Sequence, residues 1–412
     1  MSSQPLRIGD IVELTAERLA FGGDAVAHHN GLAVFITLGA PGERLSVRIT
    51  EVRKNFARAT IEEILVPSPS RRAAPCKYFG ECGGCQLQHI DYAVQRAANV
   101  TFIRDALTRI GKLDWPHEIE VVASPEFGYR TRAEVKLERP RGGEAGNIRI
   151  GFVHARSHSV CDVEDCPILV PELNSALHLL RSVIGESPQA ADVTMHGRGV
   201  AEIDLAAGQS GVTVAPHLEG LPGGRISRVV RGAVYDFDAA TFFQVNPFLL
   251  EALVEEAVGD AGGRSALDLY AGVGLFTVQL ARQFESVAGI ESDQRAAAFA
   301  RQNLSSNGIE NVEFHSAAVE PALNQIVRSG KSRFRRPDLL VLDPPRSGAA
   351  EAVPGILALE PRHVTYVSCD PSTLARDLRQ LSASGYRLAR VKGFDLFPQT
   401  YHVETVAHLE RR

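Results

Sequence analysis

The chain has 412 residues, 44% of them hydrophobic and 23% charged, which is typical of a folded protein with two or three domains. No stretch approaches the ~18 consecutive apolar residues of a membrane span, and the first residues contain no apolar signal segment. We therefore expect a cytoplasmic protein without membrane contact. The net charge of -5 excludes recognition of nucleic acid by bulk charge and leaves that role to local basic clusters.

Residues 1–67 alternate apolar and polar positions in short runs separated by glycine and proline, which predicts a small all-β barrel. The runs are IVEL, GLAVFI, LSVRIT and ARATIEEI. The stretches AFGGDAVAHHNGLAVFI and APGERLSVRITEVRKNFARATI resemble the TRAM domain, a small RNA-binding barrel attached to RNA-modifying enzymes. The resemblance implies RNA binding, whereas the alternation is common to many small barrels. A Pro-Ser-Pro-Ser linker ends the segment.

Three of the six cysteines lie within ten residues near the start of the second predicted domain, residues 68–240: Cys76, Cys82 and Cys85. So few cysteines in so long a chain do not form a secreted disulfide framework. Gly83-Gly84 frees the backbone to wrap around a metal or inorganic sulfur. A fourth ligand is needed, and Cys161 and Cys166 are both available. Four thiolates suit structural zinc as well as iron, but only one Cys-x2-Cys arm is present, so the spacing favours iron.

The rest of the second domain contains both helical and strand-like hydrophobic patterns, which predicts an α+β unit. We expect a helix within about 91–116, packed on the third domain, and another helix at 171–184. Strands are expected at 128–139 and 147–163. The sequence indicates less about architecture here than elsewhere.

Residues 241–412 alternate strand-like and helical stretches, which predicts a doubly wound α/β sheet. The strand-like runs are ALDLY, SVAGIE, NVEFHS, DLLVLD and HVTYVS. Helical stretches such as FTVQLARQF, QRAAAFARQNLSSN and STLARDLRQLSAS lie between them.

The end of the first of these strands carries the motif Asp268-Leu-Tyr-Ala-Gly272-Val-Gly274. Open α/β sheets bind ligands at such strand ends, and glycine lets a ligand approach the backbone. Glu291 ends the second strand, where a carboxylate can accept both hydroxyls of a ribose. A dinucleotide-binding domain is the alternative. Because the third glycine is absent and Asp268 stands before the glycines, as in class I methyltransferases, we favour S-adenosylmethionine over NAD.

Reactive groups follow two more strands, in LDPPR (342–346) and VSCDP (367–371), and FPQTYHVE (397–404) lies near the C-terminus. Strand ends on one side of a parallel sheet face one crevice. A thiolate that adds to carbon 6 of uracil turns the ring into an enolate whose carbon 5 can take a methyl group, after which a base must remove the carbon 5 hydrogen. Cys369 would supply the thiolate and Glu404 the base. Taken alone, Cys369 would be read as an inert buried thiol and Glu404 as a surface ion-pair partner. Their joint occurrence with the cofactor motif favours catalytic roles for both.

Five phrases of the sequence are similar to the RNA uridine-5-methyltransferase family: FFQVN, DLYAGVGLFT, LDPPR, VSCDPSTLARD and FPQTYHVE. The similarity extends over nearly the whole chain. The family includes the transfer-RNA enzyme and the bacterial 23S ribosomal-RNA enzymes, and it implies a class I (Rossmann-like) methyltransferase fold for residues 241–412. The TRAM-like barrel and the cysteine cluster together resemble the 23S enzymes, because the transfer-RNA enzyme lacks both.

The resemblance also implies site residues. Five positions match contacts to S-adenosylmethionine, the last of them also near the target base: Gln244, Tyr270, Leu275, Glu291 and Asp343. Phe242 matches an aromatic position near the flipped uridine, and Arg130 or Arg132 a basic substrate contact. The phrase DCPIL resembles the fourth cluster ligand of the family, which implies a [4Fe-4S] cluster held by Cys76, Cys82, Cys85 and Cys166.

Two departures from the family pattern are visible. Asp370-Pro371 follows the nucleophilic cysteine where family members often have Asn-Pro, and small residues, Ala317 and Ala318, stand after the third strand where an acidic or amide residue is expected. The contact to the adenine ring of the cofactor is then expected from the backbone alone.

We therefore expect a multidomain α/β enzyme that methylates carbon 5 of a uridine in 23S ribosomal RNA after drawing it out of the folded RNA, acting as a monomer. Its parts would be a TRAM-like barrel (1–67), an iron–sulfur and substrate-binding domain (68–240) and a methyltransferase domain (241–412). The alternatives are a transfer-RNA uridine-5-methyltransferase, a non-catalytic RNA-binding protein of ribosome assembly, and an NAD-dependent or iron–sulfur redox enzyme. The complete set of Cys369, Glu404 and Gln244 argues against an idle catalytic domain.

Overall fold

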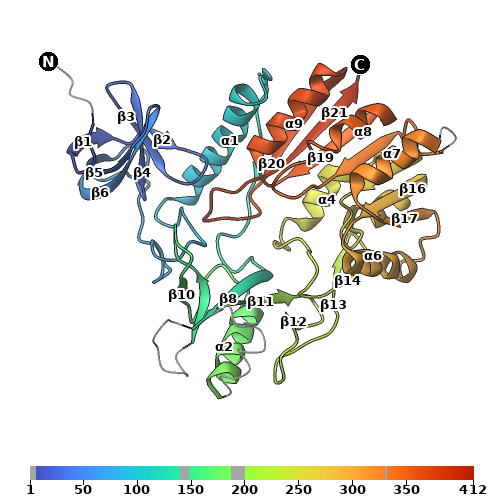
Figure 1. The fold of residues 1–412 in the computed structure, drawn as a ribbon, viewed down its shortest axis with the longest axis horizontal. Coiled ribbons are helices and arrows are strands. Elements are labelled where there is room, and N and C mark those ends of the chain that lie inside the picture. Colours follow the sequence, from blue (N-terminus) through green and yellow to red (C-terminus); the bar gives the residue numbers. More distant parts are fainter. Residues whose placement is uncertain (1–5, 140–147, 187–199, 330–331) are drawn as a thin grey trace.

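The elements form three groups that follow one another along the chain (Figure 1) in the computed structural model, which describes residues 6–139, 148–186, 200–329 and 332–412. A six-stranded sheet comes first, a five-stranded sheet with one helix comes second, and an eight-stranded sheet covered by helices comes last. Within the described ranges, no helix has both the length and the apolar character needed to cross a membrane.

The N-terminal sheet has the strand order β1-β5-β6-β4-β3-β2. Alternate residues of its strands are buried, as with Leu45, Val47 and Ile49 of β5, so the period-two pattern of the sequence directs one side of each strand into the core. Two strands, β2 and β3, add to the four runs predicted from the sequence. The strands are β1 (Ile11–Thr15), β2 (Arg18–Leu19), β3 (Ala25–His29), β4 (Leu32–Thr37), β5 (Arg44–Val52) and β6 (Phe56–Val66).

The middle sheet is antiparallel throughout, with the order β10-β9-β8-β11-β12. Helix α2 lays Leu173, Leu177 and Leu180 on the same core as the strands. The stretch predicted as one strand at 147–163 is a hairpin of β9 and β10, since the chain turns through Arg156 at φ 56; residue 147 lies outside the described part. The elements are β8 (Arg132–Glu138), β9 (Arg149–Val153), β10 (Val160–Asp162), α2 (Pro171–Glu186), β11 (Val200–Ala207) and β12 (Val212–Ala215).

The C-terminal sheet has the order β17-β16-β15-β18-β19-β21-β20-β7, in which β21 is antiparallel to both neighbours and the other pairings are parallel. The chain builds outward from β15 in both directions, which places a topological switch point between β15 and β18. The strands are β7 (Val121–Val122), β15 (Gly263–Leu269), β16 (Phe284–Glu291), β17 (Val312–Ser316), β18 (Leu339–Leu342), β19 (His363–Ser368), β20 (Tyr386–Phe394) and β21 (Glu404–Arg411).

Helices cover both faces of this sheet, as a doubly wound fold requires. The core on one face includes residues of α4, α5 and α6, and the core on the other face includes residues of α1, α7, α8 and α9. The helices are α1 (Tyr92–Arg109), α4 (Leu250–Val258), α5 (Leu275–Ala281), α6 (Gln294–Ser306), α7 (Val319–Ser329), α8 (Val353–Leu359) and α9 (Pro371–Ala383).

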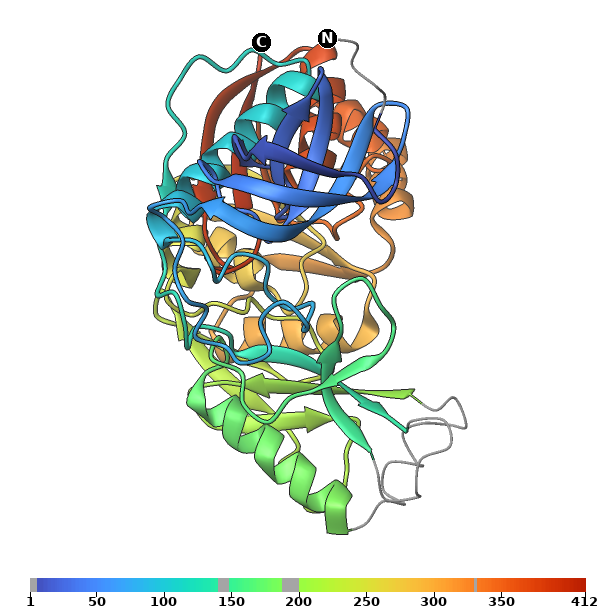
Figure 2. The same cartoon turned by 90° about the vertical axis from the view of Figure 1, so that its left-hand side faces the viewer.

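Helix α1 joins the first and last parts of the chain. Ala98 and Phe102 belong to the core of the N-terminal sheet, whereas Ile103 and Leu107 belong to the core beneath α9. Helix α1 stands between the N-terminal sheet and the C-terminal strands in Figure 1, and the N-terminal sheet lies in front of it in Figure 2. The helix therefore fixes the position of the N-terminal sheet beside the larger one.

Besides α1, strand β7 and a two-stranded hairpin also precede residue 241 and pack with the C-terminal sheet. Strand β7 extends it at one edge by pairing with β20. The hairpin of β13 (Ile226–Val230) and β14 (Ala233–Phe237) shares its core with α4, α5 and α6. The hydrophobic core of the C-terminal part thus begins upstream of the residue at which the sequence placed its boundary.

Candidate functional site

The turn after β15 presents open backbone and one unsatisfied carboxylate atom. Asp268 is fully buried at the end of the strand, and Thr277 donates to its Oδ2 (2.5 Å). Its Oδ1 has no hydrogen-bond partner among the described residues, and burial raises the pKa of Asp268 to about 7. Tyr270, Gly272 and Gly274 follow with φ of 60, 54 and 89. Backbone in this left-handed region favours glycine and leaves space for a ligand to approach.

Glu291 stands at the end of the neighbouring strand β16, facing this turn. Its Oε2 accepts a hydrogen bond from Gly272 N (2.9 Å), and its Oε1 accepts one from Asp293 N (2.6 Å). The carboxylate is therefore fixed next to the glycine turn, where it can accept further hydrogen bonds from a ligand. Leu275, the first residue of α5, is buried on the other side of the same turn.

Three strand ends bring Asp343, Cys369 and Glu404 together. Asp343 directly follows β18, and Cys369 directly follows β19. Strand β21 runs antiparallel to β19 with Ser368 opposite Thr405, so the next residues outward, Cys369 and Glu404, stand at the same edge. The rule that parallel strand ends share one edge predicted that Asp343 and Cys369 lie together, whereas Glu404 reaches this edge at the start of the antiparallel strand β21.

The electrostatics of this group reflect mutual proximity. Burial raises the pKa of Cys369 to about 12, and the carboxylate of Glu404 adds to the rise. Glu404 is 3% exposed; burial raises its pKa well above the usual carboxyl range, and the nearby Asp343 raises it further. The pKa of Asp343 rises to about 7 because of burial, opposed by a hydrogen bond from Gln244 Nε2 to its Oδ2 (3.1 Å). Two buried carboxyl groups with raised pKa values therefore lie beside a thiol, a grouping that is more frequent at functional sites than elsewhere.

Arg346 and His402 belong to this site, although the sequence analysis did not single them out. Arg346 interacts with the Cys369 thiol and opposes the rise in its pKa. Burial and Arg346 together lower the pKa of His402 to about 4, so its ring is neutral at pH 7. Both residues occur in quoted motifs, LDPPR and FPQTYHVE, but only the tertiary contact with Cys369 reveals the role of Arg346.

Gln244 and Phe242 lie in the segment before α4. Gln244 is buried, and its bond to Asp343 places it within the catalytic group. Phe242 is 58% exposed, which leaves its ring free to contact a substrate.

The two candidate arginines on the middle sheet differ in their surroundings. Arg132 donates to the backbone oxygen of Thr241 and to Asp204 Oδ1 (3.1 Å), so it holds the segment that leads to Phe242. Arg130 lines a cavity of 640 Å³ that also includes Arg346 and His402. Of the pair, Arg130 is therefore the better placed to reach a substrate.

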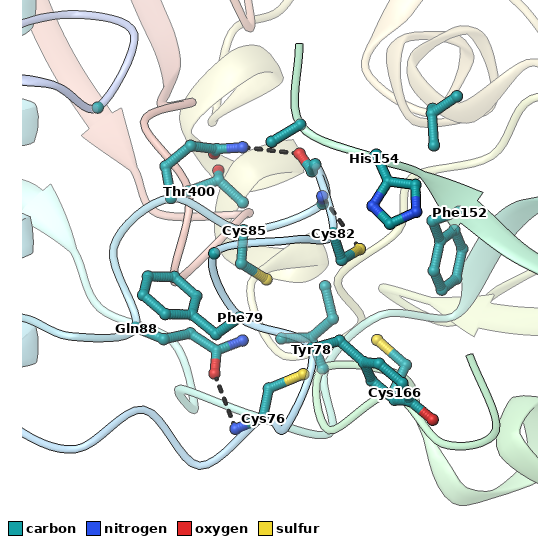
Figure 3. Close-up of a pocket in the computed structure, with 18 of the residues that line it drawn as sticks. Cys76, Tyr78, Phe79, Cys82, Cys85, Gln88, Phe152, His154, Cys166 and Thr400 are labelled. Atoms are coloured by element: carbon teal, nitrogen blue, oxygen red, sulfur yellow. Dashed lines mark hydrogen bonds between the residues drawn. The ribbon is translucent and has the colours of Figure 1, made fainter. Parts of the chain in front are cut away.

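The same cavity is lined by four cysteines from two segments: Cys76, Cys82, Cys85 and Cys166. Figure 3 shows their sulfur atoms turned toward a common space. Cys161 is buried and does not line this cavity. Burial raises the pKa of both Cys82 and Cys85 to about 12 and also raises the pKa of Cys166. Converging thiols buried in this way can hold a metal centre once their protons are displaced.

Gln399 connects the cysteine loop to the segment that carries Glu404. Its backbone oxygen accepts from Gln86 N and Leu87 N, both at 2.9 Å. Its side chain and backbone exchange two hydrogen bonds with the Gln95 side chain, each 3.0 Å long. The residue is fully buried and has φ 71. The position of segment 397–404 therefore depends on the loop that carries the cysteines.

The structure shows the surroundings of the two departures from the family pattern, Asp370 after Cys369 and the small residues after β17. Asp370 is the N-cap of α9 and accepts from Ser372 N (2.7 Å) and Thr373 N (3.2 Å). Asparagine and aspartate cap helices equally well, so this change preserves the helix start after Cys369. The Ala317 amide donates to the Glu291 backbone oxygen (2.9 Å), which fixes the loop after β17 against the cofactor-side turn.

Comparisons with known proteins agree with this architecture. The family model of tRNA (uracil-5-)-methyltransferases matches residues 226–412, and the TRAM domain model matches residues 5–61. The match to the catalytic family begins at β13, in accord with the core that this hairpin shares with the C-terminal sheet.

Similarity to relatives extends over the whole chain. An RNA methyltransferase of Aquifex aeolicus is 32% identical over 100% of this chain and 99% of its own. The 23S rRNA (uracil(1939)-C(5))-methyltransferase RlmD of Cronobacter sakazakii is 34% identical over 98% and 96%. The crystal structure of the Pyrococcus abyssi tRNA (uracil-54, C5)-methyltransferase in complex with S-adenosyl-L-homocysteine is 26% identical, covers 96% of this chain and 99% of its own, and superposes with a TM-score of 0.71.

Proposed function

The chain belongs to the RNA (uracil-5-)-methyltransferase family, and from this premise we propose that it methylates a uridine of 23S ribosomal RNA through a covalent bond to Cys369, with Glu404 as the base. The methyl donor is S-adenosylmethionine, in keeping with the S-adenosyl-L-homocysteine bound by the archaeal relative. The convergence of Cys369, Asp343 and Glu404 at one sheet edge carries the proposal.

In the proposed reaction the Cys369 thiolate forms a bond to carbon 6 of the uracil, and the electrons of the ring double bond move to an enolate. Carbon 5 then takes the methyl group, whose bond to the sulfonium sulfur breaks. Glu404 removes the proton from carbon 5, the ring double bond forms again, and the thiolate leaves. Cys369 gives its thiol proton to solvent before the attack and regains one after it leaves, and Glu404 releases the carbon 5 proton to solvent, so both residues end in their starting state.

The environment of each group suits its proposed step. Arg346 is positioned to stabilise the thiolate of Cys369 against the effect of burial. The raised pKa of Glu404 makes its carboxylate, once formed, a stronger base than an ordinary glutamate. Gln244 donates to Asp343 and so fixes this carboxyl group beside Glu404. We assign Phe242 and Arg130 to the contact with the extruded nucleotide, because one is exposed and the other lines the cavity next to His402.

On the cofactor side, the free Oδ1 of buried Asp268 and the fixed carboxylate of Glu291 fit the ammonium and ribose hydroxyls of the donor. Tyr270 and Leu275 flank the same turn. The adenine contact remains a prediction that rests on backbone groups near Ala317.

The choice of ribosomal over transfer RNA is supported by the RlmD relative, which is more similar in sequence than the archaeal transfer-RNA enzyme. That archaeal enzyme nevertheless covers nearly the whole chain, so transfer RNA is the second candidate substrate.

Mapping of 5-methyluridine in cells with and without the gene decides between the two RNAs. We expect the deletion to remove a 5-methyluridine from 23S ribosomal RNA, and the wild-type gene to restore it where a Cys369→Ala gene does not. Loss of the modification from transfer RNA alone would assign the enzyme to the other substrate.

We also propose that Cys76, Cys82, Cys85 and Cys166 hold a [4Fe-4S] cluster. Four converging thiols and the Gly83-Gly84 turn fit such a group, which requires cysteine thiolates wrapped closely around inorganic sulfur. Because Gln399 ties this loop to segment 397–404, the cluster would position the segment that carries Glu404 and need not transfer electrons.

Metal analysis of protein made without oxygen tests this assignment. The wild type should be brown with about four iron atoms per chain, as a four-thiolate cluster requires. Cys82→Ser should lose the colour and much of the soluble protein, whereas Cys161→Ser should keep both. A variant series in which Cys161→Ser bleaches the protein and Cys166→Ser does not would contradict the choice of ligands.

A further inference from the structure

A second group of side chains of metal-ligating types lies next to the cysteine cavity. Glu81, His154 and Cys161 each place one ligand atom within 4.8 Å of the other two. Cys161 is 3% exposed, His154 is half-buried and Glu81 is exposed. The three residues come from the cysteine loop, the end of β9 and β10, so they meet only in the folded chain.

Backbone hydrogen bonds hold these segments together independently of the three side chains. Gly83 N donates to Val153 O (2.9 Å), and Ala155 N donates to Glu81 O (2.8 Å). Cys161 lies opposite Phe152 in the β9–β10 hairpin. A Cβ on Gly83 would stand 3.0 Å from Val153 O, so glycine at this position allows the loop to approach the hairpin closely. The donor atoms are thus gathered by the fold before any metal binds.

The three side chains have no partners among the residues that the structure describes. Over the residues that the structure describes, no hydrogen bond or ion pair engages the carboxylate of Glu81, the imidazole of His154 or the thiol of Cys161. A buried thiol within 4.8 Å of a carboxylate and an imidazole, with none of the three engaged by another described residue, offers a mixed set of metal ligands. Figure 3 shows the His154 ring at the rim of the cysteine cavity, beside Phe152.

We propose that Glu81, His154 and Cys161 form a mononuclear site for a divalent transition metal of the zinc class. One sulfur, one nitrogen and one oxygen donor suit borderline cations, whereas magnesium and calcium prefer oxygen donors alone. A thiolate and a carboxylate balance the charge of a divalent ion, and a water molecule completes four-coordination. The ion would pin the cysteine loop to the β9–β10 hairpin. The site is separate from the four cysteines proposed to hold iron and does not depend on the proposed methyl transfer.

Zinc analysis of the iron-loaded full-length protein tests the site. After exposure to zinc chloride and removal of loosely bound metal, the wild type should retain about one zinc per chain. His154→Asn and Cys161→Ser should each lose it while keeping their iron. His158→Asn, which changes an exposed histidine on the turn of the same hairpin, is the matched control and should retain zinc. His154→Asn removes a half-buried side chain, so it keeps the test decisive even if Cys161→Ser folds poorly.

X-ray absorption at the zinc edge identifies the ligands. The proposed site predicts one sulfur at about 2.3 Å and nitrogen or oxygen neighbours at about 2.0–2.1 Å. A shell of four sulfur atoms would place the zinc in the cysteine cavity instead and overturn the proposal. Zinc retained by both His154→Asn and Cys161→Ser, or absent from the wild type, would overturn it as well. Neither result would affect the tests of methyl transfer, which measure RNA modification.

Discussion

Replacing Cys369 by alanine is expected to reduce RNA methylation by at least about a thousandfold, as loss of a covalent nucleophile does in other enzymes. Of the six cysteines, only Cys369 follows a strand of the C-terminal sheet and stands beside Glu404. Binding of S-adenosylmethionine, followed by calorimetry, should be unchanged, because the cofactor-side carboxylates Asp268 and Glu291 belong to other strands.

A transcript that contains 5-fluorouridine separates the nucleophile from a merely structural cysteine. Fluorine at carbon 5 cannot leave as a proton does, so the wild-type enzyme should remain joined to this RNA after methyl transfer, as a band that survives denaturation. Cys369→Ala should form no such band, whereas Ser372→Ala, a change at the start of the same helix α9, should form it normally. An alanine variant that still methylates, or still forms the band, would remove Cys369 from the mechanism.

The order of strands and the chemistry at their ends were predictable because both are local properties of the sequence. The runs from ALDLY to HVTYVS form β15 to β19 in parallel. Glu291 ends β16, Asp343 and Cys369 directly follow β18 and β19, and Asp268 lies one residue before the end of β15. Once the sheet is parallel, Asp268, Glu291, Asp343 and Cys369 must share one edge. This part of the site follows from periodicity and motif position alone.

Contacts between distant segments could not be predicted in this way. Gln399 is one residue of the phrase FPQTYHVE, and nothing in its neighbourhood indicates that its oxygen accepts from two amides of the cysteine loop. Arg346 follows two prolines and becomes important only because it reaches Cys369. Such pairings depend on how α1 and the middle sheet place the loops, which is a property of tertiary packing.

Cys161 illustrates the same limit for the metal sites. Spacing left both Cys161 and Cys166 available as the fourth cluster ligand, because a sequence does not show which face of a hairpin a thiol occupies. In the fold, Cys166 lines the cavity with the other three thiols, while Cys161 turns toward Glu81 and His154. Nothing in the sequence around Glu81 or His154 indicates metal binding, since single residues of these types are common on protein surfaces.

Glu404→Gln is expected to stop the reaction one step later than loss of Cys369. Attack by the thiolate and methyl transfer both precede removal of the carbon 5 hydrogen, so an enzyme that lacks only the base should complete these two steps. Ordinary RNA should then accumulate as a methylated adduct joined to Cys369. The adduct is visible as a denaturation-resistant band whose formation requires S-adenosylmethionine, and mass spectrometry should find the methyl group on the attached nucleotide.

The stability of this variant distinguishes a base from a structural ion-pair partner. Burial raises the pKa of Glu404 in the folded chain above its unfolded value, so the stability that this group contributes is present at low pH and is lost as the pH rises through the folded pKa. Glutamine resembles the protonated form and has no proton to lose. At about pH 8 the variant should therefore unfold with a free energy no lower than that of the wild type, measured by denaturant titration.

Glu410→Gln supplies the matched control, because Glu410 lies on the same strand β21 but forms an exposed ion pair with Arg387. This variant should turn over normally and show no trapped RNA. If Glu404 were also only an ion-pair partner, its glutamine variant would be destabilised or weakly active and would trap nothing. A folded Glu404→Gln protein that binds S-adenosylmethionine yet forms no adduct would exclude Glu404 as the base. Asp343, a second buried carboxyl group with a raised pKa beside Glu404, would then be the next candidate for the base. The role of Cys369 would still be tested separately by the fluorouridine experiment.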